Sequence, residues 1–287
     1  SASSTNCTKT TVGTFGLPNV PTVVFVQFVE LADRKIIELL RGAFENGLYS
    51  AGYKLGMFLS IVATGFRFAW QPFFLQIAHR PDARGVYARV LTYYLAVIGW
   101  LYLLLTAFVR PLVEWDIPGV GPLIDPDYWP GIAVFPIILL AQVFNGMYAV
   151  FMVGIYLEKR TRILAAIAGV AAAVNVGGNL LLVPRYGMWA AAWLTVVSWV
   201  LMAGWLYAYI QRIYPIPWEW GRVAHLWLVG GLAYGAGAIG RFFGAQWPGY
   251  LLSVLFPLLL IITGLATRGE RERLRGWLRR SPGSHQG

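Results

Sequence analysis

Residues 131–157 read GIAVFPIILLAQVFNGMYAVFMVGIYL, 27 consecutive positions without Asp, Glu, Lys or Arg. A transmembrane α-helix needs about 20 predominantly apolar residues to cross about 30 Å of hydrocarbon. The strands of a membrane β-barrel are about 10 residues long and alternate in polarity. The length and continuity of this run therefore predict a membrane-spanning helix.

Seven further runs of this kind lie between charged residues or Pro and Gly positions. We expect the eight spans at residues 17–40, 48–78, 86–110, 131–157, 163–183, 188–210, 223–243 and 247–267. The predicted fold class is all-α, a polytopic transmembrane bundle that covers residues 15–267. We expect the Ser/Thr-rich residues 1–14 to be a disordered leader or the edge of a truncated reading frame, and residues 268–287 to be a basic cytoplasmic tail.

The composition of the 287 residues agrees with a membrane protein. Hydrophobic residues make up 57% and charged residues only 13%, with a mean hydropathy of +0.59; soluble domains carry about 25% charged residues. A single cysteine, Cys7, excludes a disulfide framework and a thiolate metal site, and the three histidines are widely separated. We therefore expect neither a metal nor a cofactor.

The net charge of +10 is concentrated where it indicates membrane lipids, and not nucleic acid, as the partner. Six arginines follow the last apolar run, where they would meet anionic headgroups on the cytoplasmic side. Counting alternate connections gives fourteen Lys and Arg on the side of the tail and four on the other. By the positive-inside rule, both termini are predicted to be cytoplasmic.

Ionisable residues within a span are costly and usually functional, so they are the candidate site. The first predicted span contains Glu30, Asp33 and Arg34, and the second contains Lys54 and Arg67. If spans one and two form a hairpin whose turn is centred near residues 43 and 44, Asp33 and Lys54 lie at the same depth. Glu30 and Arg34 are four residues apart and can pair along one helix face.

Two interpretations of these residues remain open. In one, Arg34, Lys54 and Arg67 contact phosphate groups of an anionic substrate at different depths. In the other, Asp33 pairs with Lys54 and Glu30 with Arg34 to hold helices together, while Arg67 extends to the interface.

Several other polar positions favour structural roles. Asn175 and Asn179 lie on one helical face in a segment rich in small residues, and such amides usually bridge helices. Asp125 and Asp127 resemble acidic catalytic residues of an external loop, but the flanking prolines favour a turn. Three glycines fit close helix packing: Gly235, Gly237 and Gly240.

Four segments together resemble a known family: GLP at 16–18, ADRKII at 32–37, GLYSAGYKLG at 47–56 and AWQPF at 69–73. They are similar to the second half of oligosaccharide (O-antigen type, polysaccharide biosynthesis) flippases of the multidrug/oligosaccharidyl-lipid/polysaccharide exporter superfamily. The resemblance implies a MATE-like fold of fourteen helices, of which these eight spans would be helices seven to fourteen.

The resemblance also implies an activity, namely translocation of a lipid-linked, pyrophosphate-bearing oligosaccharide across a bacterial cytoplasmic (inner) membrane. We expect the chain to require a first lobe as its partner. Because no nucleotide-binding motif is present, an ion gradient or the membrane potential would supply the energy, and Glu30 and Asp33 are candidate proton or sodium sites.

Two other functions are compatible with the sequence. A multidrug or peptidoglycan-precursor exporter of the same superfamily would share the fold and differ in the lining of its cavity. A membrane glycan polymerase or ligase would need large external loops with catalytic residues, and the only sizeable one predicted here is at 119–130. We therefore expect a transporter and not an enzyme.

Overall fold

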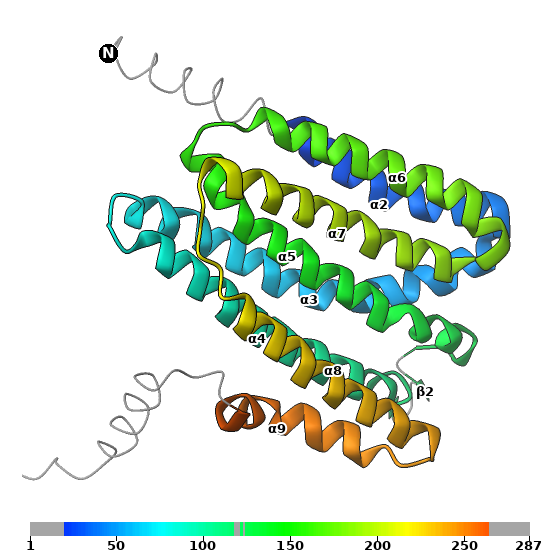
Figure 1. The fold of residues 1–287 in the computed structure, drawn as a ribbon. Coiled ribbons are helices and arrows are strands. Elements are labelled where there is room, and N and C mark those ends of the chain that lie inside the picture. Colours follow the sequence, from blue (N-terminus) through cyan, green and yellow to red (C-terminus); the bar gives the residue numbers. More distant parts are fainter. Residues whose placement is uncertain (1–19, 118–120, 123, 264–287) are drawn as a thin grey trace, which may run out of the picture. The chain divides into compact units, whose positions relative to one another are not determined.

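The computed structural model describes residues 20–117, 121–122 and 124–263, with side chains from residue 31 onward except at 117 and 121 (Figure 1). The predicted leader 1–14 and the tail 268–287 lie outside the described residues. The helices and strands are α2 (Val20–Arg41), α3 (Ala43–Ile77), α4 (Ala83–Val113), β1 (Asp116–Ile117), β2 (Gly121–Pro122), the 3-10 helix η3 (Pro126–Val134), α5 (Phe135–Leu157), α6 (Arg162–Tyr186), α7 (Met188–Ile213), α8 (Trp220–Phe242) and α9 (Trp247–Thr263).

The all-α class is confirmed, and each predicted apolar run overlaps one α-helix, with the run 131–157 beginning in η3. Within the described residues, five helical segments are long and apolar enough to cross a membrane: Ala83–Val113, Pro126–Leu157, Arg162–Tyr186, Met188–Ile213 and Trp220–Phe242. The described part of α9 is apolar but only 17 residues long. α2 and α3 are not among the five, and they are the helices that carry the charged candidate residues.

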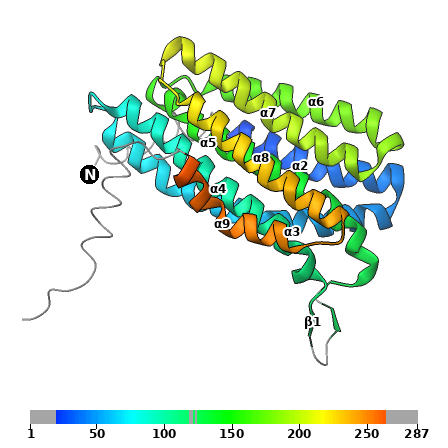
Figure 2. The ribbon, with the colours of Figure 1, turned by 60° about the horizontal axis from the view of Figure 1, so that its bottom comes forward.

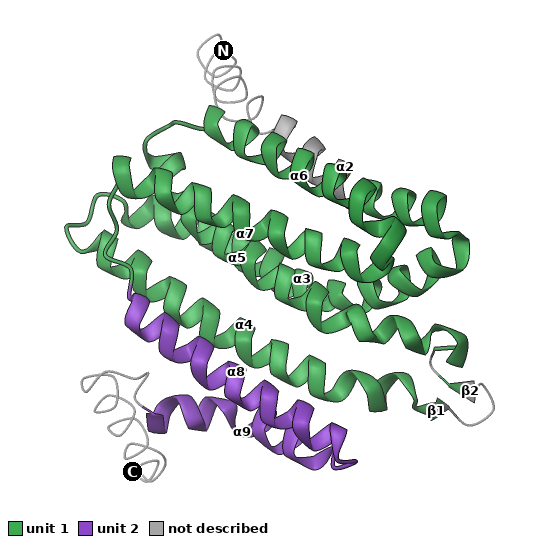
Figure 3. Ribbon diagram, turned by 45° about the vertical axis from the view of Figure 1, so that its right-hand side comes forward, with its two compact units in different colours: residues 1–218 green, residues 219–287 purple. Residues whose placement is uncertain are grey.

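The chain forms two compact units, residues 1–218 and 219–287 (Figure 3). In the first unit α5 is the central helix, and it packs against α3, α4 and α7 (Figure 1). In the most apolar part of the segment Pro126–Leu157, 78% of the residues are buried, the highest share among the five apolar segments; α5 itself contains no charged residue. α6 packs against both α2 and α7, so α2 joins the bundle through α6 as well as through α3.

Three connections of the first unit meet at one end of the bundle. The Glu45 carboxylate accepts hydrogen bonds from the Arg41 Nε (2.8 Å) and from the backbone N–H of Met188 (2.8 Å), which joins the α2–α3 turn to the α6–α7 turn. η3 packs on the first turns of α3, where Gly47 lies against the Tyr128 ring. These connections are the ones with few Lys and Arg in the sequence.

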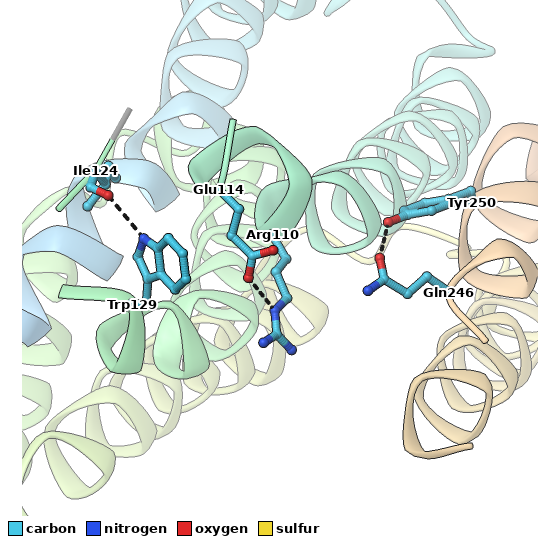
Figure 4. Close-up of polar contacts among 6 residues, drawn as sticks. All are labelled: Arg110, Glu114, Ile124, Trp129, Gln246 and Tyr250. Carbon is cyan, nitrogen blue, oxygen red and sulfur yellow. Dashed lines mark hydrogen bonds and ion pairs between the residues drawn. The ribbon is translucent and has the colours of Figure 1, made fainter. Parts of the chain in front are cut away.

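The segment between α4 and α5 forms a short folded cap. β1 and β2 pair antiparallel, with Ile117 opposite Gly121. The Asp125 carboxylate accepts a hydrogen bond from the N–H of Asp127 (3.0 Å) and caps η3, which confirms the predicted turn role of these residues. The Trp129 indole donates to the Ile124 carbonyl (3.0 Å), a contact drawn in Figure 4.

The turn between α2 and α3 differs from the prediction. It consists of the single residue Gly42, whose φ of 94° is readily adopted only by glycine. A turn centred at residue 42 instead of 43–44 places Asp33 opposite residue 51 of α3. The inward-facing side chain of α3 near that level is Tyr49, whose hydroxyl lies 3.5 Å from Asp33, and not Lys54. The expected pairing of Asp33 with Lys54 is not formed, and Lys54 is exposed.

The second unit is a helical hairpin of α8 and α9. A Cβ atom placed on Gly237 would lie 3.0 Å from the Cα of Gly249, so the two helices touch through their backbones, and one on Gly240 would lie 2.8 Å from the Ala245 carbonyl oxygen. The predicted close packing is confirmed at these two glycines and is wrong at Gly235, where nothing lies within 4 Å of the Cβ position. The Tyr250 hydroxyl donates to the Gln246 side chain (2.6 Å) within the first turn of α9 (Figure 4).

Candidate functional site

Asp33 lies at the centre of a buried polar cluster in the first unit. Its side chain is 1% exposed and accepts hydrogen bonds from the Asn179 amide (2.7 Å) and the Thr195 hydroxyl (2.9 Å). The Tyr49 hydroxyl lies 3.5 Å away, and Asn179 also donates to Asn175 (3.0 Å). These five residues, the Asp33 cluster, come from α2, α3, α6 and α7.

The local sequence explains why these helices come close enough to share one carboxylate. Asp33 precedes Ile36 and Ile37, which are buried on the same face of α2 because they follow at three and four residues. On α7 three buried alanines, residues 190–192, lie within the turn that precedes Thr195. Small side chains allow helix backbones to approach, as is usual in membrane bundles.

The cluster surrounds a carboxylate with neutral partners. Among the described side chains, the ion pairs are Lys35–Glu38, Arg41–Glu45, Arg110–Glu114 and Arg222–Glu219, and none includes Asp33. A buried ionised carboxylate without a cation is expensive, because it loses its hydration. A proton or a monovalent cation would neutralise it.

The atoms around Asp33 suit a small cation as well as a proton. The Asn179 Oδ1 is buried and accepts no hydrogen bond from a described residue, so this oxygen is available to a cation. The buried Asn175 Nδ2 also has no hydrogen-bond partner among the described residues, but it is a donor and would not bind a cation. The Thr195 hydroxyl oxygen lies 2.9 Å from the Asp33 carboxylate. Oxygen atoms are the ligands that hard cations prefer. The described residues include no group of three or more His, Cys, Asp or Glu.

The other predicted site residues lie outside this cluster. Arg34 is half-buried, with its guanidinium carbon 4.6 Å from the centre of the Tyr53 ring and its Nε buried without a hydrogen bond among the described residues. Lys54 follows Tyr53 and is exposed, and the side chain of Glu30 is outside the described part. Arg34 therefore contacts Tyr53, whereas Lys54 is its neighbour in sequence only, because consecutive residues of a helix do not face each other.

Arg67 belongs to a different part of α3. It is thirteen residues beyond Lys54, about 20 Å along the helix. Its Nη2 donates to the side-chain oxygen Oδ1 of Asn145 in α5 (2.9 Å), and the side-chain Nδ2 of Asn145 donates to the Oε1 of Gln142 (3.0 Å). The structure therefore does not bring the three predicted cations together: Arg34 contacts Tyr53, Arg67 contacts Asn145, and Lys54 is exposed.

Sequence reasoning identified part of the Asp33 cluster and missed the rest. Asp33 was selected as a charged residue within a span, and Asn175 and Asn179 as a pair four residues apart. Tyr49 and Thr195 gave no comparable signal, because tyrosine and threonine are common in membrane helices. Only the packing of α7 against α2 and α6 distinguishes Thr195.

Comparisons with protein-family models, with curated proteins and with solved structures found no match to this chain. The function is therefore argued from the residues and their geometry.

Proposed function

We propose that the chain is one lobe of an ion-coupled flippase that moves a lipid-linked oligosaccharide across the bacterial inner membrane, the second lobe of a MATE-like fold with eight spans. The observation that carries this proposal is the Asp33 cluster, a buried carboxylate shared by four helices without a cationic side chain. The sequence resemblance supplies the substrate class, and the helical bundle with several spanning helices is compatible with it.

A flippase must remove a desolvation cost. A pyrophosphate and its sugar hydroxyls cannot enter hydrocarbon unaided, because their hydrogen bonds to water would be lost. Arg34 supplies a positive charge held against Tyr53, and Lys54 and Arg67 supply exposed positive charges along α3. In this scheme the lipid tail stays in the bilayer, and the charged headgroup follows the cations.

Ion binding at Asp33 would bias the helix arrangement that transport requires. Its carboxylate holds α2 to α6 through Asn179 and to α7 through Thr195. A proton or sodium ion bound to the carboxylate competes with Asn179 and Thr195 for its oxygen atoms. The bound ion would therefore weaken these interhelical hydrogen bonds in the conformation in which they form, and would favour the other conformation of the bundle. Differential ion affinity of two states is what couples a gradient to movement.

The proposed orientation places both termini in the cytoplasm. The α2–α3 turn, the α6–α7 turn and the cap between α4 and α5 meet at one end of the first unit, and their connections carry few positive residues. At the opposite end the Arg84 guanidinium lies 4.6 Å from the Tyr214 ring, where the Arg-rich connections meet. The positive-inside rule then assigns that end to the cytoplasm.

The proposal is tested by measuring leaflet reorientation in proteoliposomes. The chain is reconstituted together with the first lobe that it is expected to require and with a fluorescent polyprenyl-pyrophosphate oligosaccharide. The fraction protected from an external glycosidase is then followed under a sodium or a proton gradient. We expect one gradient to accelerate reorientation and the Asp33→Asn variant to lose at least tenfold of that acceleration. Asp82→Asn, which changes an exposed aspartate at the start of α4, is the matched control and should keep it.

The competing functions give different outcomes in the same vesicles. Reorientation of a peptidoglycan precursor, or export of a cationic dye, without movement of the oligosaccharide would assign the chain to another transporter class. New bonds between glycans would indicate a polymerase or ligase. Gradient-insensitive reorientation in both wild type and Asp33→Asn would refute the coupling role of Asp33.

A further inference from the structure

The first unit carries an apolar groove between α3 and α4, of about 270 Å³, lined by Val62, Phe66, Val90, Tyr93, Tyr94, Val97 and Ile98. The Val62 and Val97 side chains at its rim are 43% and 52% exposed, whereas Tyr94 and Ile98 are buried at its floor. Pockets for drug-sized ligands hold about 300–1,000 Å³. The groove therefore accommodates a segment of one hydrocarbon chain.

A cationic site adjoins this groove. Phe66, which lines the groove, is followed directly by Arg67, whose side chain is exposed and donates one hydrogen bond to Asn145. A guanidinium has five N–H donors arranged in a planar fork that matches two oxygens of a phosphate. Arg67 therefore retains donors for an anion while it is held in place by Asn145.

Tyr94 connects the groove with the cationic site. Its ring lines the groove and lies 4.5 Å from the Phe66 ring, and its hydroxyl reaches over Gly146, the residue after Asn145. The Tyr94 side chain is 6% exposed, and no described residue hydrogen-bonds to its hydroxyl. The Tyr148 hydroxyl is likewise buried without a hydrogen bond in the described part, and both lie within electrostatic reach of Arg67.

The depth of Arg67 along α3 fits a phospholipid phosphate. The 35 residues of α3 extend about 52 Å, more than the hydrocarbon thickness of about 30 Å. Arg67 is seven residues, about 10 Å, from the middle of the helix. If α3 is centred in the bilayer, Arg67 lies about 5 Å inside the hydrocarbon boundary, a distance that a long basic side chain spans.

We propose that the α3–α4 groove and Arg67 form a binding site for an anionic phospholipid. Its phosphate binds the exposed Arg67 guanidinium, and one acyl chain lies along the groove. The positive charge of Arg67 selects an anionic headgroup. The volume of the groove is large enough for a segment of only one of the two acyl chains of a phospholipid. The site is separate from the Asp33 cluster. It assigns Arg67 to a resident phospholipid, as an alternative to a contact of Arg67 with the transported headgroup.

The test is lipid binding to the delipidated protein in detergent, measured by native mass spectrometry. Wild type should bind dioleoyl phosphatidylglycerol at least tenfold more tightly than dioleoyl phosphatidylcholine. Arg67→Ala should weaken phosphatidylglycerol binding at least tenfold, with Arg67→Lys intermediate because a lysine lacks the fork. Val97→Trp, which fills the groove, should weaken it comparably. Arg110→Ala and Leu181→Trp, at exposed positions on other surfaces, are the matched controls and should bind as wild type.

Each other outcome overturns the proposal in a defined way. Unchanged phosphatidylglycerol binding in Arg67→Ala and Val97→Trp would show that the lipid binds elsewhere. Competition by inorganic phosphate at equal concentration would show that the groove contributes nothing. A polyprenyl phosphate that binds tenfold more tightly than phosphatidylglycerol would replace the phospholipid by the carrier lipid as occupant. Because transport is not measured, these results are independent of the oligosaccharide assay.

Discussion

Replacement of Asp33 by asparagine or by alanine separates its charge from its role as a hydrogen-bond acceptor. In Asp33→Asn, the new carbonyl oxygen still accepts from Asn179. The new amide can donate to the Thr195 oxygen, whose hydroxyl then donates to the Ala191 carbonyl 2.9 Å away. Only the long 3.5 Å contact with Tyr49 is lost, and a buried charge without a cationic partner is removed.

The expected free energies of unfolding follow from this count. Asp33→Asn should lie within about 1 kcal/mol of wild type, or be more stable, because the hydrogen bonds are rearranged and not lost. Asp33→Ala removes the acceptor of a buried amide and leaves a cavity, for which we expect a loss of about 1–3 kcal/mol. The strongest interhelical hydrogen bonds measured in membranes contribute about 1.7 kcal/mol, which lies within the loss expected for Asp33→Ala.

The assay is reversible unfolding in mixed detergent, followed by tryptophan fluorescence. Thr195→Val is the control, because its hydroxyl also has an acceptor in its own helix, and we expect a loss of about 0.6 kcal/mol. If Asp33→Asn is as destabilised as Asp33→Ala, the negative charge itself holds the helices together. The interpretation of Asp33 as a carboxylate awaiting a proton or cation would then be refuted.

Three further substitutions test the packing. Gly146→Ala should destabilise the first unit by about 1–3 kcal/mol, measured by thermal unfolding, because a methyl group there overlaps the Tyr94 hydroxyl and ring. Glu45→Ala should cost about 1–2 kcal/mol in the same measurement, because it uncaps the Met188 N–H at the start of α7. Gly237→Ala should separate α8 from α9 and increase protease cleavage between them, because its Cβ meets the partner backbone at 3.0 Å.

Each of these substitutions has a matched control in the same chain. Gly169→Ala and Gly235→Ala add a methyl group to a helix where nothing lies within 4 Å, so they should be neutral or slightly stabilising. Glu114→Ala breaks an ion pair with Arg110 at the surface (Figure 4) and should cost at most about 1 kcal/mol. Equal losses in a test variant and its control would refute the packing argument for that position.

The helices were predictable from the sequence because apolar run length is a local property. The run at 188–210, for example, corresponds to α7 (Met188–Ile213) with the same first residue. The register between α2 and α3 was not predictable, because it depends on the single residue Gly42, which turns the chain at a φ of 94°. Each residue by which the centre of the turn shifts changes by two the residue of α3 that lies opposite a given residue of α2. As a result Tyr49, and not Lys54, lies beside Asp33.

The partners of Asp33 were hidden for a different reason. Asn179 and Thr195 follow it by 146 and 162 positions, so no periodicity within one helix relates them to it. The pair Asn175 and Asn179 was visible because its spacing is local. The Arg67–Asn145 bond, across 78 positions, could not be derived from spacing either.

The first unit holds α2 to the α6–α7 pair by two contacts of different chemistry. At the end of the helix the Glu45 carboxylate joins two turns and accepts from a backbone N–H and from Arg41, so this contact is already paired with a cation. Nine residues before the Gly42 turn, about 14 Å along α2, Asp33 makes the second contact through neutral side chains only. α2 lies along α6 (Figure 2). An added proton or sodium ion is therefore expected to act on the Asp33 contact and leave the turns joined, so that α2 would move relative to α6 and α7 about a fixed end. Because contacts this far apart contribute nearly additively, the Asp33 and Glu45 variants report separately on the ion-sensitive contact and on the fixed one.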